Sequence, residues 1–159
     1  MSTPIPSLSA LVGAHPDALR EIYADGRPAD PVDLGEAPRG RVLALGTGAQ
    51  LFLLGRPLVR AFSTELFPWK GMRFNPHGAS GENVLLGLGV LRFRTEVGPS
   101  RLDGRPALIL TYAAPAHGNP WPFRAFTDEL RLVGGSVAVG PTFFEASTKP
   151  LLWFGLGIV

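Results

Sequence analysis

Short runs of apolar and β-branched residues, separated by glycine, proline and polar residues, dominate the chain after Pro68. Runs of this length and composition are typical of β-strands. Together with an upstream run at Arg41–Leu45, and with the second run divided at Gly87–Gly89, the pattern predicts about eight strands. The runs after Pro68 are Trp69–Phe74, Asn83–Thr95, Ala107–Tyr112, Arg124–Val133, Val137–Phe144 and Leu151–Ile158.

The connections between these runs indicate how the strands pair. The segment Pro99–Arg105 and the pair Gly134–Gly135 are short, turn-forming sequences, which make consecutive strands antiparallel. The predicted fold class is therefore all-β, with an antiparallel, up-and-down barrel of about eight strands. Such a barrel can close on itself and enclose side chains or one small ligand. A two-sheet sandwich is the alternative architecture.

Two segments have helical patterns instead. Residues 1–35 form an N-terminal segment with a predicted helix at Pro16–Ala24, where proline suits the first turn and Gly26 follows the end. In residues 49–66, leucine and phenylalanine recur at helical spacing with arginines on another face, which predicts an amphipathic helix kinked at Pro57. With 159 residues, we expect a single domain over 1–159 whose barrel spans 36–159.

The order of these elements resembles that of the lipocalin-like, or calycin-type, barrels. A helical segment leads through a glycine-containing stretch into a first strand, and an up-and-down run of strands follows from about Gly35 to Val159. That family has a Gly-X-Trp motif at the first strand, whereas Gly35-Glu36-Ala37 and Arg39-Gly40-Arg41 lack the tryptophan. The resemblance implies a barrel that binds a small apolar molecule. The stretches Trp69–Phe74, Val97–Pro106 and Thr127–Arg131 are also similar to those of bacterial proteins of unassigned function.

Composition and charge exclude several classes of function. The chain has no cysteine, so it has neither disulfides nor thiolate metal ligands, and its three histidines are too far apart in sequence to form a paired metal motif. The net charge of +2 comes from dispersed basic residues, which argues against a nucleic-acid partner. We predict no metal, no cofactor, no transmembrane segment and, because no convincing signal peptide is present, a cytoplasmic location.

The run from Arg124 is the most informative about a site. Successive side chains of a strand point to opposite faces. Phe126, Leu130 and Leu132 make one face of this run more apolar, so this face should point into the barrel. The same face carries Arg124 and Asp128, which would form either a structural ion pair at the barrel end or polar anchors for a ligand.

Aromatic residues on the predicted strands complete the candidate site. Core packing accounts for most of them, yet some can line a cavity in a small barrel. Tyr112 stands out because, if it points inward with Leu108 and Leu110, its hydroxyl needs a hydrogen-bonding partner. The predicted ligand-binding residues are Trp69, Tyr112, Arg124, Phe126, Asp128, Phe143 and Trp153.

Three hypotheses about function follow. The first is lipocalin-like binding of a small apolar or amphipathic molecule within the barrel. The second is a cofactor-independent isomerase or cyclase, in which the barrel holds a flexible substrate and Asp128 or Tyr112 is the acid or base. The third is a membrane-surface or protein-interaction module that uses the helix near 49–66.

Overall fold

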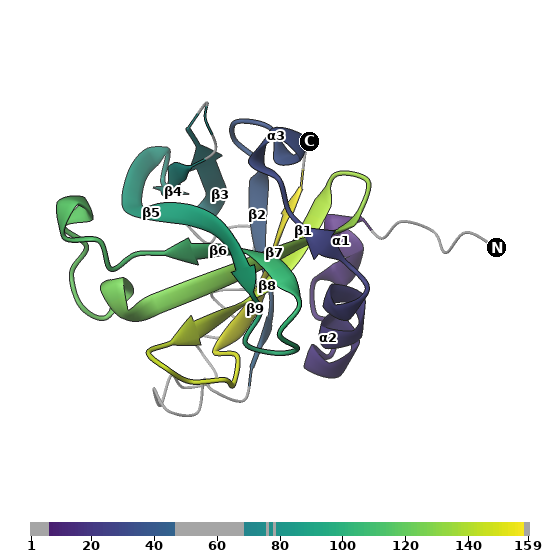
Figure 1. The fold of residues 1–159 in the computed structure, drawn as a ribbon. Coiled ribbons are helices and arrows are strands. Elements are labelled where there is room, and N and C mark those ends of the chain that lie inside the picture. Colours follow the sequence, from purple (N-terminus) through teal and green to yellow (C-terminus); the bar gives the residue numbers. More distant parts are fainter. Residues whose placement is uncertain (1–6, 47–68, 76, 78, 158–159) are drawn as a thin grey trace.

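A computed structural model shows a barrel of antiparallel strands with short helices around it (Figure 1) and describes residues 7–46, 69–75, 77 and 79–157. The strands are β1 (Arg27–Pro28), β2 (Arg39–Leu45), β3 (Trp69–Phe74), β4 (Ser80–Leu85), β5 (Leu88–Pro99), β6 (Pro106–Thr111), β7 (Phe126–Gly134), β8 (Val137–Phe144) and β9 (Leu152–Gly157). The helices are α1 (Leu8–Leu11), α2 (Pro16–Ala24) and α3 (Pro31–Leu34), with 3₁₀ turns η2 (Pro115–His117) and η3 (Phe123–Ala125).

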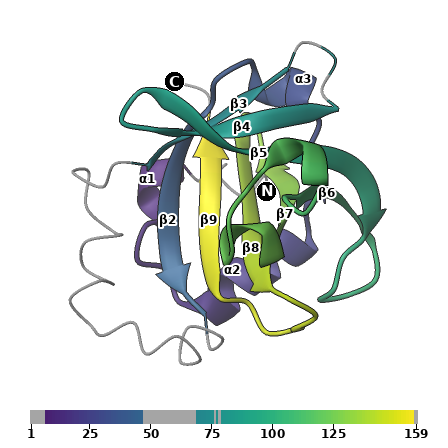
Figure 2. The ribbon, with the colours of Figure 1, turned by 90° about the vertical axis from the view of Figure 1, so that its left-hand side faces the viewer.

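The eight strands β2 to β9 close into a complete ring. Each pairs antiparallel with its neighbour in sequence, and β9 also pairs with β2, where Gly40 lies opposite Leu156. Figure 2 shows β2, β9 and β8 side by side along one wall. The predicted all-β fold with an eight-stranded antiparallel barrel is confirmed. The sandwich alternative is wrong, because the β2–β9 ladder joins the first barrel strand to the last.

Turn residues fix several boundaries that the sequence predicts. The helix Pro16–Ala24 and the strands Trp69–Phe74 and Val137–Phe144 have the predicted bounds. Between β4 and β5 the backbone turns at Leu86 and Gly87, whose φ angles are 52° and 81°. Positive φ at both central residues is the geometry of a two-residue hairpin turn, and the predicted division of the run there is confirmed.

Other segments differ from the prediction. The sequence pattern predicts no strand or helix between Gly26 and the barrel, yet this stretch contains β1, which pairs with β7, and then α3. Strand β7 begins later than the predicted Arg124, because Phe123–Ala125 form the turn η3 and β7 starts only at Phe126. The amphipathic helix predicted near 49–66 lies outside the described residues.

The core inside the barrel extends to the end that α3 covers. Leu34 of α3 and Ala29 before it are buried with interior residues of the strands, among them Phe74, Phe93 and Leu132. In Figures 1 and 2, α3 lies at one end of the barrel and the β8–β9 connection at the opposite end. One end of the barrel is therefore filled by packed side chains.

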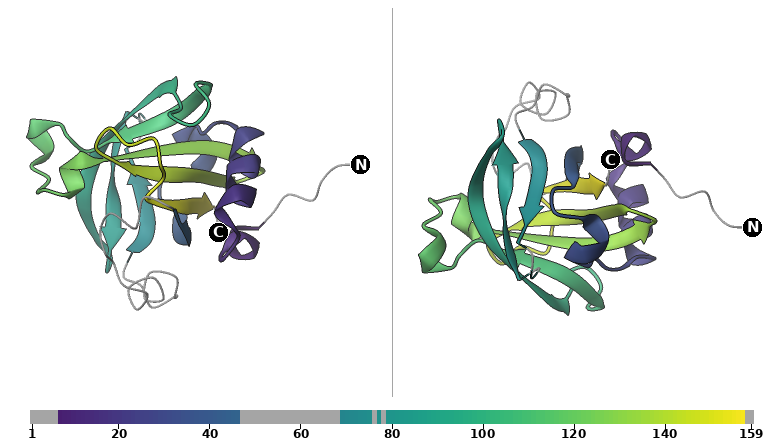
Figure 3. Two further views of the ribbon diagram at one scale, coloured as in Figure 1. Left: turned by 90° about the horizontal axis from the view of Figure 1, so that it is seen from below. Right: turned by 90° about the horizontal axis from the view of Figure 1, so that it is seen from above.

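A second apolar layer lies on the outside of the barrel. Leu11 of α1, with Leu19 and Tyr23 of α2, packs against outward-facing residues that include Val139 and Trp153. Figure 3 shows α1 and α2 along one side of the barrel, opposite β3 and β4. Strands beneath the helices are consequently buried on both faces, which explains why β8 is buried along almost its whole length.

Polar side chains hold this outer layer in place. The Arg131 guanidinium donates to both carboxylate oxygens of Asp103 at 2.7 Å and lies 4.2 Å from the centre of the Tyr23 ring. Beside it, the buried Glu129 accepts hydrogen bonds from the Tyr23 hydroxyl, at 2.5 Å, and from the Ser100 hydroxyl, at 2.6 Å. These contacts tie α2 and the β5–β6 turn to β7.

In the part of the chain that the structure describes, no helix combines the length and the apolar composition that crossing a membrane requires.

Leu34 tests the contribution of α3 to the closed end of the barrel. Leu34→Ala should lower the free energy of unfolding by about 2–5 kcal/mol, the range for deleting a buried leucine side chain. Val32→Ala on the same helix is the matched control, since Val32 is 81% exposed and its loss should change stability by less than about 0.5 kcal/mol. Urea denaturation followed by circular dichroism measures both, and equal effects would contradict the role of α3.

Candidate functional site

A cavity of about 400 Å³ occupies the barrel interior beyond the packed end. Residues from β2, β3, β4, β5, β7, β8 and β9 line it, and so does Tyr112, immediately after β6. Phe123 of η3 also lines the cavity and is 38% exposed, which places it at the rim. The apolar wall consists of Val42, Met72, Leu85, Leu91, Phe126, Leu152 and Phe154, with Phe123 at the rim.

A continuous chain of polar side chains crosses this apolar cavity. The Trp69 indole N–H donates to Asn83 Oδ1 at 2.9 Å, and the Asn83 amide donates to the Tyr112 hydroxyl oxygen at 3.2 Å. The Tyr112 hydroxyl in turn donates to Asp128 Oδ2 at 2.5 Å, and the Thr142 hydroxyl donates to Asp128 Oδ1 at 2.6 Å. We call this set of residues, Trp69, Asn83, Tyr112, Asp128 and Thr142, the polar chain.

Strand register brings the acidic end of the polar chain together. Asp128 on β7 lies directly opposite Thr142 on β8 and opposite Leu110 on β6, two residues before Tyr112. Inward side chains on neighbouring strands therefore meet at one level of the barrel. The carboxylate belongs to the interior face of β7, together with Leu130 and Leu132, as the alternation predicts.

Burial changes the acid–base properties of these groups. It raises the pKa of Asp128 from 3.8 to about 6, and hydrogen bonds from Thr142 and Tyr112 oppose that rise. Burial also raises the pKa of the Tyr112 hydroxyl well above its usual value, and the nearby Asp128 charge adds to the effect. Asp128 is thus a carboxyl group that gains and loses its proton near neutral pH, inside an apolar cavity.

The structure brings together four of the residues predicted to bind a ligand. Trp69, Tyr112, Phe126 and Asp128 all line the cavity. Sequence reasoning missed Asn83 and Thr142, which join them in the polar chain. Thr142 could have been found from the sequence, because strand alternation places it on the same inward face of β8 as Ala138. No comparable signal exists for Asn83, whose role is defined by contacts with residues far away in sequence.

The predicted position of Arg124 is wrong. It lies in η3, before β7 begins, and its side chain is exposed. Because a 3₁₀ turn does not continue the alternation of the strand, Arg124 does not share the inward face with Asp128. The partners of the Asp128 carboxylate are two neutral hydroxyl groups, so the predicted ion pair is also wrong.

Phe143 and Trp153 were also predicted to line the cavity, and both predictions are wrong. Each faces the outside of the barrel: Trp153 packs edge-on against Tyr23 of α2 at 5.8 Å, and the Arg101 guanidinium lies 5.1 Å from the centre of the Phe143 ring. Thr142 and Leu152 face the cavity. Because side chains alternate along a strand, their neighbours Phe143 and Trp153 point the opposite way.

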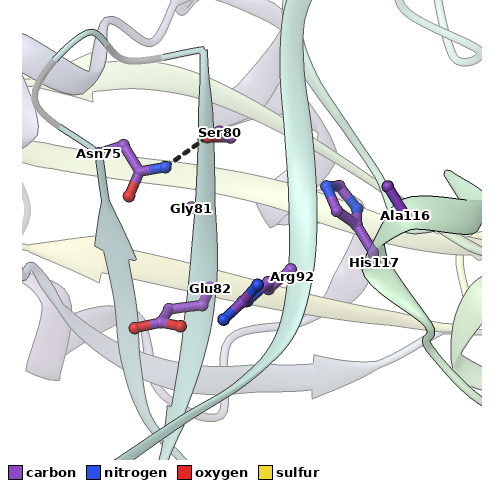
Figure 4. Close-up of a pocket in the computed structure, with 7 residues that line it drawn as sticks. All are labelled: Asn75, Ser80, Gly81, Glu82, Arg92, Ala116 and His117. Atoms are coloured by element: carbon purple, nitrogen blue, oxygen red, sulfur yellow. Dashed lines mark hydrogen bonds between the residues drawn. The ribbon is translucent and has the colours of Figure 1, made fainter.

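A polar depression on the outer face of β4 and β5 is the other candidate (Figure 4). It has a volume of about 460 Å³; Glu82 and Arg92 lie side by side in it, and His117 reaches in from η2. The Glu82 carboxylate already binds Arg73 at 3.0 Å.

Among the described residues, no group of three His, Cys, Asp or Glu side chains is placed to hold a metal ion. The depression lacks the apolar enclosure of the barrel cavity, which is therefore the stronger candidate.

No protein-family model matches this chain, and no curated protein is significantly similar to it. Among solved structures, the chain is similar to a protein from Thermomonospora curvata, with a TM-score of 0.55 and 17% sequence identity over 95% of this chain and 92% of that chain. At this identity the likeness shows the fold alone.

The raised pKa of Asp128 predicts a distinctive dependence of stability on pH. Because the pKa is about 6 in the folded protein and near 3.8 in the unfolded chain, the folded state holds a proton that the unfolded state releases between these values. Stability should therefore fall as pH rises from 4 to 7, by about 2 kcal/mol more in the wild type than in Asp128→Asn, which cannot ionise.

Chemical denaturation of both proteins across this pH range measures the difference, and every other titrating group cancels in the comparison. Parallel stability curves for the two proteins would contradict the burial of an ionisable Asp128. The variant should also retain its fold at pH 7, since the amide has the same shape and leaves no cationic partner behind among the described residues, while one of the two hydroxyls must turn its hydrogen away from the amide NH2.

Proposed function

We propose that this protein binds a small apolar or amphipathic molecule inside the barrel, as its lipocalin-like pattern implies. The observation that carries the proposal is the cavity of about 400 Å³ with apolar walls and a single polar chain. Ligand pockets typically enclose about 300–1,000 Å³ and combine apolar walls with a few convergent polar groups. Packed protein cores, by contrast, leave few voids larger than a water molecule.

The distribution of packing within the barrel supports this proposal. Phe74, Phe93 and Leu132 fill the end beside α3, whereas the residues around Asp128 surround open space. Aromatic rings are also placed along the cavity wall, where Trp69 packs edge-on against Phe154 at 6.0 Å. Rigid aromatic side chains provide a large contact area for an apolar guest.

A cofactor-independent isomerase or cyclase is the second candidate, favoured by the hydrogen bond between Tyr112 and Asp128. A carboxyl group with a pKa of about 6 can accept or donate a proton near neutral pH, which suits a general acid or base. An apolar cavity around it would position a flexible substrate. The third hypothesis, a surface module that uses residues 49–66, depends on residues outside those described.

Filling the cavity should abolish binding. Leu152 lines the cavity, and Leu152→Trp places a bulky indole in the space that a guest would occupy. Leu102→Trp is the matched control, because Leu102 packs against the outer apolar layer, away from the cavity. The probe is the neutral fluorophore N-phenyl-1-naphthylamine, whose emission rises when it enters an apolar site.

We expect saturable binding of this probe to the wild type and to Leu102→Trp, and at least a tenfold loss of affinity in Leu152→Trp. Native mass spectrometry of freshly purified protein complements the titration, since a retained guest adds its own mass. Equal binding to all three proteins, or to none, would refute a guest site within the barrel.

A further inference from the structure

When Asp128 is ionised, the hydrogen bonds of the polar chain can run in only one direction. An indole N–H is a donor only, so Asn83 must present its carbonyl oxygen to Trp69. The Asn83 amide nitrogen therefore donates, at 3.2 Å each, to the Leu91 carbonyl and to the Tyr112 hydroxyl oxygen. Having accepted that bond, the Tyr112 hydroxyl places its own hydrogen on Asp128.

Every donor hydrogen of the polar chain is used by this arrangement. The single N–H of Trp69, both amide hydrogens of Asn83 and the hydroxyl hydrogens of Tyr112 and Thr142 each have a partner. The remaining capacity consists of acceptor lone pairs, and they are concentrated on Asp128. A carboxylate offers about four acceptor positions, of which Tyr112 and Thr142 occupy one on each oxygen.

The charge of Asp128 has no cationic partner among the described residues that line the cavity. That lining contains no lysine, arginine or histidine, and Arg124 is exposed on η3. A buried charge is costly unless an opposite charge or sufficient hydrogen bonds compensate it, and here only two neutral hydroxyls do so. The described residues thus leave the Asp128 carboxylate without the cation or strong hydrogen-bond donor that would compensate its charge.

We infer that the guest is an amphipathic amine, whose protonated nitrogen donates to Asp128 while its apolar body fills the cavity. This inference rests on the proposed binding function and deepens it by naming the head group. The cavity lining also contains aromatic rings, among them Trp69 and Phe126, which suit a cation. A carboxylate head group, such as that of a fatty acid, would meet a like charge and find no free donor in the polar chain.

Three probes with the same apolar chain test the head group: n-octylamine, 1-octanol and octanoate, each titrated by calorimetry at pH 7.5. We expect octylamine to bind the wild type about 10- to 100-fold more tightly than octanol, the gain from a charged hydrogen bond, and octanoate to bind most weakly. In Asp128→Asn, octylamine should lose this advantage and octanoate should gain affinity.

Glu82→Gln is the matched control, because it removes a carboxylate from the outer face of the same barrel, and it should leave all three affinities unchanged. Equal or tighter binding of octanol or octanoate to the wild type would overturn the amine inference and leave the binding function standing. The same follows if the amine preference survives in Asp128→Asn. Binding of none of the three probes, together with no binding of N-phenyl-1-naphthylamine, would overturn the binding function itself.

Discussion

Strand β7 imposes the constraint on which both layers of this protein depend: it is buried on its two faces at once. Its inward side chains, Asp128 and Leu130, belong to the barrel interior, while Glu129 and Arg131 point outward beneath α2. Because the side chains of a strand alternate strictly, a shift of register by one residue would exchange the two sets. The interior would then receive a glutamate and an arginine, and the attachment of α2 would be lost.

The two faces of β7 differ in how fully their charged side chains are compensated. Outside the barrel, Arg131 is paired with Asp103. Glu129 accepts hydrogen bonds from the Tyr23 and Ser100 hydroxyls and a third from the Arg101 backbone N–H at 2.7 Å, so these charges are compensated. Inside, the partners of Asp128 among the described residues are two hydroxyl groups, and burial raises the pKa of its carboxyl group more than these hydrogen bonds lower it. Strongly perturbed acids in cavities are characteristic of functional sites, whereas well-paired networks fix structure. On the same strand, Asp128 therefore has the properties of a functional group, whereas Glu129 and Arg131 have those of structural residues.

Local signals in the sequence predicted the elements well, because turns and strand alternation depend on neighbouring residues. The turn at Gly87 and the helix Pro16–Ala24 are examples. Alternation, however, divides a strand into two faces without saying which is inside when helices cover the outer one, and so Phe143 and Trp153 were assigned to the wrong side. The link between Trp69 and Asn83, 14 residues apart on paired strands, required the register itself.

The orientation of the polar chain begins with a glycine on β2. A Cβ atom at Gly40 would lie 2.4 Å from the Trp69 ring, so any other residue there would displace the indole. With the ring seated, its N–H fixes the Asn83 amide, the amide sets the direction of the Tyr112 hydroxyl, and the hydroxyl points to Asp128. The missing side chain of Gly40 on β2 thus helps to set which hydrogen-bond acceptors Asp128 on β7 presents to a guest. Such dependence is possible because barrel closure brings β2 and β7 around one interior.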